Sequence, residues 1–149
     1  MMMNRQINNA GLQLVKDFEG LRLKAYPDPG TGGAPWTIGY GHTGPDVHPG
    51  LVWTQGQATD ALIADLRTAE TFVTANAPVC TDNQFAALVS FAFNCGRQNL
   101  KSSTLLRLHN QHNYAVAKLE FGKWVHAAGK VLPGLFRRRK AESDLYGAA

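Results

Sequence analysis

Hydrophobic residues recur at helical spacing along most of the chain, and polar capping residues separate the helical stretches. The first predicted helix begins at Asn8 or Asn9, a residue type that caps helix N-termini, and it stops at Gly20. Glu19 is therefore its last residue. The apolar face of this helix consists of Leu14, Val15 and Phe18.

Two capping boxes predict the next helices. Thr54 with Gln57, and Thr81 with Gln84, have the Thr-x-x-Gln form in which each side chain binds the other residue's backbone N–H. The first box opens a long helix, with one apolar face made of Ala58, Leu62, Leu66, Ala69 and Val73. The second opens a very apolar helix that ends at Gly96. Further helices are expected over residues 103–110, 113–128 and 135–146.

Between the first two helices the hydrophobic period changes to two. Apolar and polar residues alternate over residues 21–26 and again over residues 36–41, and a segment rich in Pro and Gly at residues 27–33 separates the two runs. Period-two alternation around a turn predicts two antiparallel strands. The sequence therefore predicts an α+β fold, with a small β-hairpin lobe and a larger helical lobe joined by the long helix.

Composition limits this fold to one domain. The 149 residues are 44% hydrophobic and 17% charged, which is typical of one globular domain and excludes a disordered chain. We expect a single domain over residues 1–149, with lobes at roughly 14–53 and 80–149 and the N-terminal helix packed on the helical lobe. A cleft between the lobes is the expected place for a ligand.

Charge indicates the kind of partner, and cysteine content indicates the state of the thiols. The formal net charge of +4 favours an anionic partner such as a cell envelope or nucleic acid. The two cysteines, Cys80 and Cys95, are too few for a disulfide scaffold, so we expect free thiols. No tight spacing of His and Cys indicates a metal site, and neither a metal nor a cofactor is expected.

Three polar residues around the hairpin are candidates for catalysis. Glu19 faces the negative end of its helix dipole, which favours the protonated carboxyl that a general acid needs. Asp28 follows nine positions later. Enzymes that cleave glycosidic bonds typically use a pair of carboxyl groups, which Glu19 and Asp28 could provide. Thr37 begins the second strand, where its hydroxyl is suited to holding a water. The alternatives are a solvated glutamate, an aspartate that caps its own turn, and a threonine that only favours a strand.

The surrounding residues resemble a known family. Glu19-Gly-Leu-Arg-Leu-Lys-Ala-Tyr-Pro-Asp28 and Trp36-Thr37-Ile-Gly-Tyr-Gly-His42-Thr43 resemble the phage-type lysozymes, the endolysins or muramidases of tailed phages that form glycoside hydrolase family 24. The likeness continues over residues 85–96, 102–106 and 129–135. It implies a lysozyme-like fold and assigns Glu19, Asp28 and Thr37 as the catalytic residues. It also places Phe93 and Ser103 along the saccharide cleft.

The resemblance implies hydrolysis of the β-1,4 bond between N-acetylmuramic acid and N-acetylglucosamine in peptidoglycan. Glu19 would act as the general acid, while Asp28 and Thr37 position and activate water, with inversion at the anomeric carbon. The alternatives are a lytic transglycosylase, which cuts the same bond without water, and an envelope-binding protein without activity. A nucleic-acid binder is disfavoured because the net charge is small.

Two further expectations concern partners and location. A cationic run lies near the C-terminus and consists of Arg137, Arg138, Arg139 and Lys140. Three interpretations are open: a solvated helix face, one arginine that forms an ion pair with a cleft carboxylate, or a surface that binds the anionic outer membrane. We expect a monomer whose partner is peptidoglycan. The stretch from Met1 to Phe18 is polar and lacks the apolar block of a signal peptide. The expected route is therefore accumulation in the host cytoplasm, followed by access to the periplasmic wall after a holin opens the inner membrane.

Overall fold

The computed structural model describes residues 5–149, so the first four residues of the polar N-terminal stretch lie outside the described part. The chain forms two compact units. Glu19–Arg67 make one, here called the sheet unit, and the residues up to Phe18 together with Thr68–Ala149 make the other, here called the helical unit.

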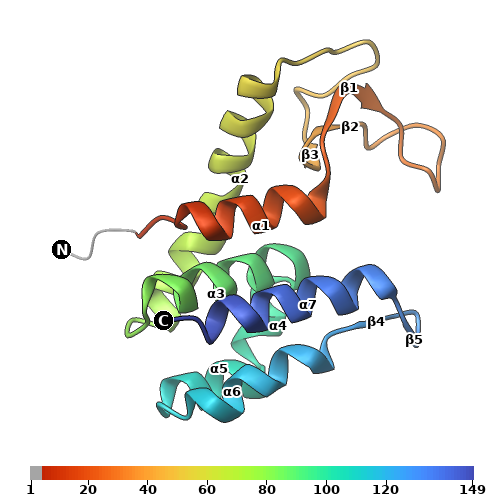
Figure 1. The fold of residues 1–149 in the computed structure, drawn as a ribbon. Helices are drawn as coiled ribbons and strands as arrows, with labels where there is room; N and C mark the ends of the chain where they lie inside the picture. The colour runs from red at the N-terminus through yellow and green to blue at the C-terminus, as the bar shows by residue number, and fades with distance from the viewer. Residues whose placement is uncertain (1–4) are drawn as a thin grey trace. The chain divides into compact units, whose positions relative to one another are not determined.

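An antiparallel three-stranded sheet forms the centre of the sheet unit (Figure 1). Its strands, in spatial order, are β1 (Arg22–Tyr26), β2 (Thr37–Gly39) and β3 (His42–Thr43). Ala25 and Ile38 are buried at its core with Val47, and Trp36, Leu51 and Trp53 pack against them. Leu21 and Leu23 share the alternation of Ala25 but are exposed. The β1–β2 register is irregular between Arg22 and Tyr26.

The helices that precede and follow the sheet in the sequence begin where the sequence predicts. Asn8 caps α1 (Asn9–Glu19) by accepting the Gly11 N–H at 2.9 Å, so Glu19 is the last helical residue as expected. The capping box before α2 (Gln55–Asn76) is complete, with both hydrogen bonds between Thr54 and Gln57 present. Every residue of the predicted apolar face of α2 is buried: Ala58, Leu62, Leu66, Ala69 and Val73.

The helical unit is organised around α3 (Asp82–Cys95), which the second capping box opens. The C-terminal helix α7 (Pro133–Tyr146) packs along α3 (Figure 1). The short helices α4 (Arg97–Lys101), α5 (Thr104–Asn110) and α6 (Tyr114–Glu120) complete the unit. The start of α1 also packs on α3, because a Cβ built on Gly11 would lie 2.6 Å from the Ala86 Cβ.

The predicted helix over residues 113–128 is wrong in its second half. The α-helix ends at Glu120, the 3-10 helix η1 (Phe121–Lys123) follows, and β4 (His126–Ala127) then pairs with β5 (Lys130–Val131). Gly129 in the intervening turn has φ +77°, a conformation that glycine adopts readily and that ends helices. None of the helices in the described part of the chain is both long and apolar enough to cross a membrane.

Candidate active site

Glu19 is held beside the turn that joins β2 to β3. A Cβ built on Gly41 would lie only 3.0 Å from Glu19 Oε1, and the φ of Gly41 is +83°. Glycine is therefore favoured at position 41, both by its backbone conformation and by the position of the Glu19 side chain, which would have to shift to make room for a Cβ. Gly20, with φ +75°, ends the helix immediately after Glu19 and turns the chain into β1.

Asp28 is fixed by the loop that follows β1. Its Oδ1 accepts the N–H of Gly30 at 2.7 Å and that of Thr31 at 3.3 Å. Its backbone N–H donates to the Gly33 carbonyl at 2.9 Å, and its own carbonyl accepts the Gly32 N–H at 2.8 Å. Asp28 thus has the turn-capping role that its position predicts, and the same hydrogen bonds orient its half-buried carboxylate.

Thr37 is the first residue of β2 and is held from both sides. It pairs with Tyr26 of β1 and with Thr43 of β3. Asp28 follows Tyr26 by two residues, so Asp28 and Thr37 belong to the same end of the hairpin. No hydrogen bond of the Thr37 hydroxyl is found among residues 5–149. Glu19, Asp28 and Thr37 all lie within the sheet unit.

His42 forms an ion-pair cluster behind this turn. Its Nδ1 lies 2.7 Å from an Asp65 carboxylate oxygen and its Nε2 lies 3.0 Å from Asp46. Burial acts to lower the pKa of His42, but the hydrogen bonds to Asp65 and then Asp46 outweigh burial, so this pKa is raised. The sequence predicts that His42 packs or forms an ion pair between lobes; the ion pair is present, with both partners in the sheet unit.

Phe93 and Ser103, the predicted cleft residues, belong to the helical unit. Phe93 is half-buried on α3. Ser103 is buried and caps α5: its Oγ accepts the Leu106 N–H at 3.0 Å and donates to the Leu100 carbonyl at 2.6 Å. Both bonds are local and backbone-directed, so the structure gives Ser103 a helix-capping role.

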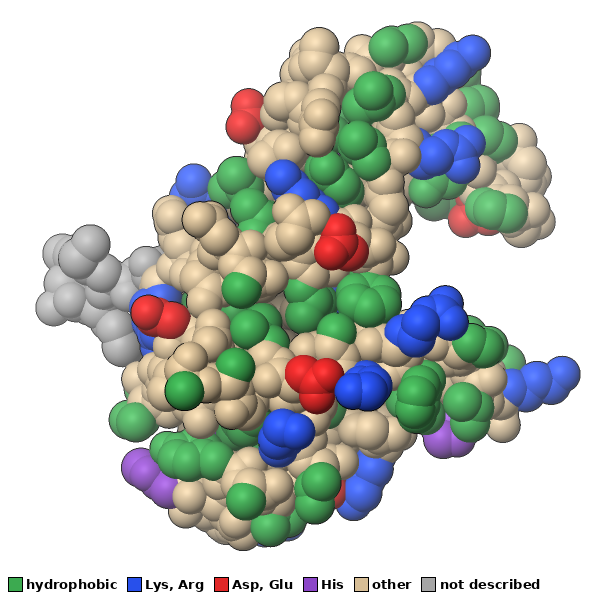
Figure 2. Space-filling view, viewed as in Figure 1, with side chains coloured by type: hydrophobic (Ala, Val, Ile, Leu, Met, Phe, Trp, Pro, Cys, Tyr) green, Lys and Arg blue, Asp and Glu red, His purple; other side chains and the backbone are tan. Residues whose placement is uncertain are grey.

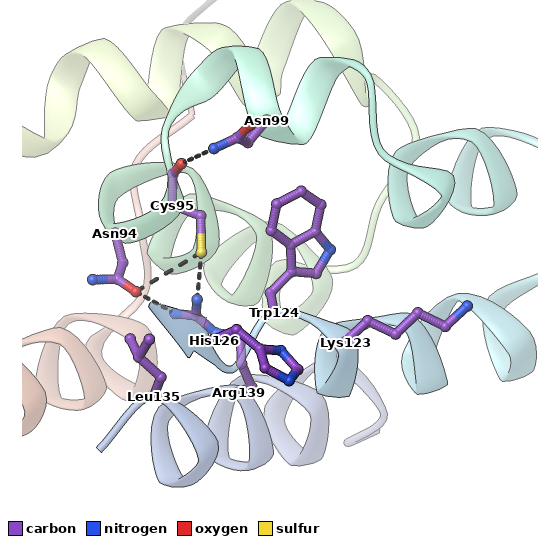
Figure 3. A pocket seen from close by; sticks show the side chains of 8 residues that line it. All are labelled: Asn94, Cys95, Asn99, Lys123, Trp124, His126, Leu135 and Arg139. Atoms are coloured by element: carbon purple, nitrogen blue, oxygen red, sulfur yellow. Dashed lines mark hydrogen bonds between the residues drawn. The ribbon is translucent and has the colours of Figure 1, made fainter. Parts of the chain in front are cut away.

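The helical unit also contains a pocket of about 430 Å³ that the sequence did not predict (Figure 3). Its lining combines two amides, a thiol, three basic side chains and two apolar ones: Asn94, Asn99, Cys95, Lys123, His126, Arg139, Trp124 and Leu135. Burial raises the pKa of the Cys95 thiol. Cys95 and Cys80 are both free thiols, as expected.

The prediction of a four-residue cationic surface at the C-terminal helix is wrong for Arg138 and Arg139. Both are buried, with exposed fractions of 3% and 1%, around the fully buried Glu142. Arg139 Nη2 donates to Glu142 Oε2 at 3.0 Å and to Asn94 Oδ1 at 2.8 Å. Ser90 of α3 donates its hydroxyl to the same Glu142 oxygen at 2.5 Å.

The burial of these two arginines changes the charge pattern of the surface. Only Arg137 and Lys140 of the run are exposed. On the face that Figure 2 shows, Lys and Arg side chains are spread among hydrophobic and uncharged ones.

The titratable side chains of the described residues 5–149 do not assemble a metal centre. Among residues 5–149, no three His, Cys, Asp or Glu side chains lie close enough together to hold a metal ion.

Known proteins share both the sequence and the fold. The sequence profile of the phage lysozyme family matches residues 16–142, a span that includes Glu19, Asp28 and Thr37. An endolysin of Bacillus phage PZA is 45% identical over 144 residues, which cover 96% of this chain and 55% of that protein. An endolysin of Acyrthosiphon pisum secondary endosymbiont phage 1 is 40% identical over 148 residues, which cover 96% of this chain and 99% of that one.

A solved structure agrees with this relationship. The endolysin from Escherichia coli O157:H7 phage FAHEc1 superposes with a TM-score of 0.88 at 34% identity, covering 99% of this chain and 96% of that one. The small sheet and the helical unit therefore define the α+β lysozyme fold, as the sequence predicts. The chain belongs to the phage lysozyme family. It spans about half the length of the Bacillus phage endolysins that it matches.

Proposed function

We propose that this chain is an endolysin that hydrolyses the β-1,4 bond between N-acetylmuramic acid and N-acetylglucosamine in bacterial peptidoglycan, causing lysis of the host cell. The observation that carries the proposal is the placement of Glu19 against Gly41 in the unit that also holds Asp28 and Thr37. Membership of the phage lysozyme family supports the same activity.

In the proposed mechanism Glu19 is the general acid. Its carboxyl proton passes to the glycosidic oxygen as the bond from that oxygen to the anomeric carbon breaks, so the leaving sugar departs as a neutral alcohol.

Asp28 and Thr37 act on the water. Asp28 Oδ1 is committed to the loop N–H groups, which leaves Oδ2 as the acceptor for a water proton. The Thr37 hydroxyl, one strand away, orients the same water through a second hydrogen bond. The water oxygen forms the new bond to the anomeric carbon, its proton goes to Asp28, and no cofactor is required.

The hairpin geometry supports inversion at the anomeric carbon. Glu19 contacts the turn after β2, whereas Asp28 lies near the residue that begins β2. The three residues of β2 span about 7 Å at about 3.4 Å per residue. An inverting enzyme needs about 6.5–9.5 Å between its carboxyl groups, and a retaining enzyme about 5–5.5 Å.

Analysis of the products from purified peptidoglycan tests the proposal. Hydrolysis gives reducing N-acetylmuramic acid ends, a transglycosylase gives anhydro ends, and an envelope-binding protein gives no products. Anhydro ends or an absence of products with folded protein would refute the hydrolase.

We also propose that the protein reaches the wall after a holin opens the inner membrane. Its family membership supports this route, since the related chains include phage endolysins. Expression with and without a holin tests it, because prompt lysis without the holin contradicts the route and leaves the hydrolase intact.

A further inference from the structure

The loop that carries Asp28 contains one further polar side chain, which the proposed mechanism does not use. This loop connects β1 to β2 (Figure 1). Over residues 28–35 only Asp28 and Thr31 have polar side chains, because the other six residues are glycine, proline or alanine. Thr31, which is exposed, is therefore the only residue besides Asp28 whose side chain can form hydrogen bonds from within this segment.

The Thr31 hydroxyl closes the second half of the loop. Its Oγ1 donates to the Ala34 carbonyl at 2.9 Å and accepts the Gly33 N–H at 3.2 Å. Ala34 lies three residues before Thr37, so the first bond holds the segment that enters β2. The second bond holds Gly33, whose carbonyl accepts the backbone N–H of Asp28 at 2.9 Å. The hydroxyl thus bridges the part of the loop that holds Asp28 and the part that leads to Thr37.

The backbone of Thr31 contacts Asp28 directly. Its N–H donates to Asp28 Oδ1 at 3.3 Å, beside the Gly30 N–H at 2.7 Å. One residue therefore binds the carboxylate with its backbone and the far side of the loop with its side chain. A shift of Thr31 that follows loss of the hydroxyl bonds would also move a donor to the Asp28 carboxylate.

The composition of the loop makes this restraint important. Gly30, Gly32 and Gly33 are three of the eight residues from 28 to 35, and glycine has the most backbone freedom of any residue. Ordering such a segment costs more conformational entropy than ordering other residues. Without the hydroxyl bonds we expect the loop to adopt additional conformations, in some of which the Asp28 carboxylate leaves its place.

We propose that Thr31 is a positioning residue: its hydroxyl fixes Asp28 relative to Thr37, and thereby fixes the place where the attacking water is bound. This inference rests on the proposed function, in which Asp28 and Thr37 hold that water. A catalytic group that is held in one productive geometry reacts faster than one that must find it. Thr31 forms no bond to the substrate in this role, and the proton of the water still passes to Asp28.

The kinetics of hydroxyl-deleted and hydroxyl-retaining variants test the proposal. Thr31→Val keeps the β-branched shape and removes the hydroxyl. We expect it to lower kcat on purified peptidoglycan by about 10-fold, since a displacement of 1 Å can lower a rate by about 10²-fold. KM should stay within about 2-fold, because saccharide binding is unchanged.

The rescue and control variants use the same chemistry. Thr31→Ser retains the hydroxyl and is expected to keep kcat within about 3-fold of the parent, the difference arising from the greater rotamer freedom of serine. Thr68→Val removes the hydroxyl of an exposed threonine on α2 and should leave kcat unchanged. Circular dichroism should show every variant folded.

Amide hydrogen exchange measured by NMR detects the loop contacts without any hydrolysis. In Thr31→Val the Gly33 N–H loses its acceptor, so its exchange should become about 5-fold faster, the factor expected for loss of one hydrogen bond. Exchange of the Gly30 N–H, which is bonded to Asp28 Oδ1, should also become faster. Both rates should remain at the parental values in Thr31→Ser and Thr68→Val.

A double-variant cycle shows whether Thr31 acts through Asp28. On the Asp28→Asn background, Thr31→Val should lower the remaining rate by less than about 2-fold, because the group that it positions has already lost its function. An independent, purely structural effect would instead give the same 10-fold loss on both backgrounds.

Four results would overturn the role of Thr31. Parental kcat in Thr31→Val, a loss that Thr31→Ser does not restore, unchanged exchange of the Gly33 and Gly30 amides, or equal losses on both backgrounds would each do so and leave the hydrolase proposal intact. Parental activity in Asp28→Asn would instead refute the proposed base, and the role of Thr31 with it.

Discussion

The carboxylate of Glu19 lies against the backbone of Gly41, so close that a Cβ at position 41 would approach Oε1 to 3.0 Å. The end of α1 and the β2–β3 turn are thus fitted to each other. The φ of +83° at Gly41 adds a second requirement for glycine.

Gly41→Ala is expected to reduce kcat by about 10-fold. Moving a catalytic group by 1 Å can lower the rate by about 10²-fold, and we expect the new methyl group to displace the Glu19 carboxyl by less than 1 Å. Gly50→Ala is the control: its φ is +86°, but a Cβ there meets nothing within 4 Å. Both variants should lose about 1–2 kcal/mol of stability from backbone strain. Equal activity in the two would show that the contact with Glu19 does not matter.

Glu19→Gln is expected to lower the rate of wall hydrolysis by at least about 10²–10⁴-fold, because the amide keeps the shape of the side chain but has no acidic proton. Asp17→Asn is the matched control, since it removes an exposed carboxylate two residues earlier on the same helix. Turbidity clearing by purified variants measures both. A folded Glu19→Gln protein within 10-fold of the parent would remove Glu19 from the mechanism.

The first product released from a β-linked substrate is expected to be the α anomer. Single displacement by a water held at Asp28 and Thr37 inverts the anomeric carbon. Proton NMR at early times distinguishes the two anomers before they equilibrate. A β anomer, or a trapped covalent adduct on Asp28, would replace the inverting mechanism with a retaining one.

The His42 cluster is expected to make stability depend on pH. The folded-state pKa of His42 is raised from 6.5, so its contribution is complete below that value and is lost as the pH rises through the raised pKa. The hydrogen bond to His42 lowers the pKa of Asp46 from 3.8, so the contribution of Asp46 is present above 3.8 and is lost as the pH falls through the lowered pKa. The cluster therefore stabilises most strongly between about pH 4 and pH 6.5.

Urea unfolding of the parent and of Asp65→Asn across this range measures the effect. The difference in unfolding free energy should be largest near pH 5.5 and should shrink above pH 7. Asp60→Asn, an exposed position on the same helix, is the control. A difference that does not change with pH would mean that the Asp65 contact is not electrostatic.

Glu142→Gln is expected to destabilise the fold by about 3–5 kcal/mol, because it removes the buried carboxylate charge that Arg139 pairs with at 2.7 Å. The denaturant midpoint at constant slope measures this loss. Asp144→Asn, which removes an exposed partner of Lys140 on the same helix, should change the midpoint far less. Similar losses in both variants would argue against a special role of the buried network.

Local signals in the sequence predicted much of the fold. The cap at Asn8, the capping boxes at Thr54 and Thr81, and the apolar face of α2 depend only on neighbouring residues, and all are confirmed. The break after Glu120 could not be found in the same way, because the helical period continues where tertiary packing forms a 3-10 helix and a hairpin.

In the candidate site, too, the features set by neighbouring residues could be predicted, and those set by distant residues could not. Glu19 at the end of α1 follows from the cap and Gly20, whereas the ion pairs of His42 need Asp65 from another element. The burial of Arg138 and Arg139 comes from the packing of α7 on α3, whose Ser90 lies 52 residues before Glu142. A run of basic residues gives no sign of such a distant partner.

Asp28 has two roles. Its Oδ1 accepts the N–H groups of Gly30 and Thr31 and so holds the loop, and its carboxylate is the proposed base. A replacement at position 28 without a side-chain oxygen would relax the loop as well as remove the proposed base. Only Asp28→Asn retains the acceptor geometry, so it alone isolates the chemistry. Random mutagenesis scored by cell lysis would therefore overstate how strictly the reaction itself demands an aspartate.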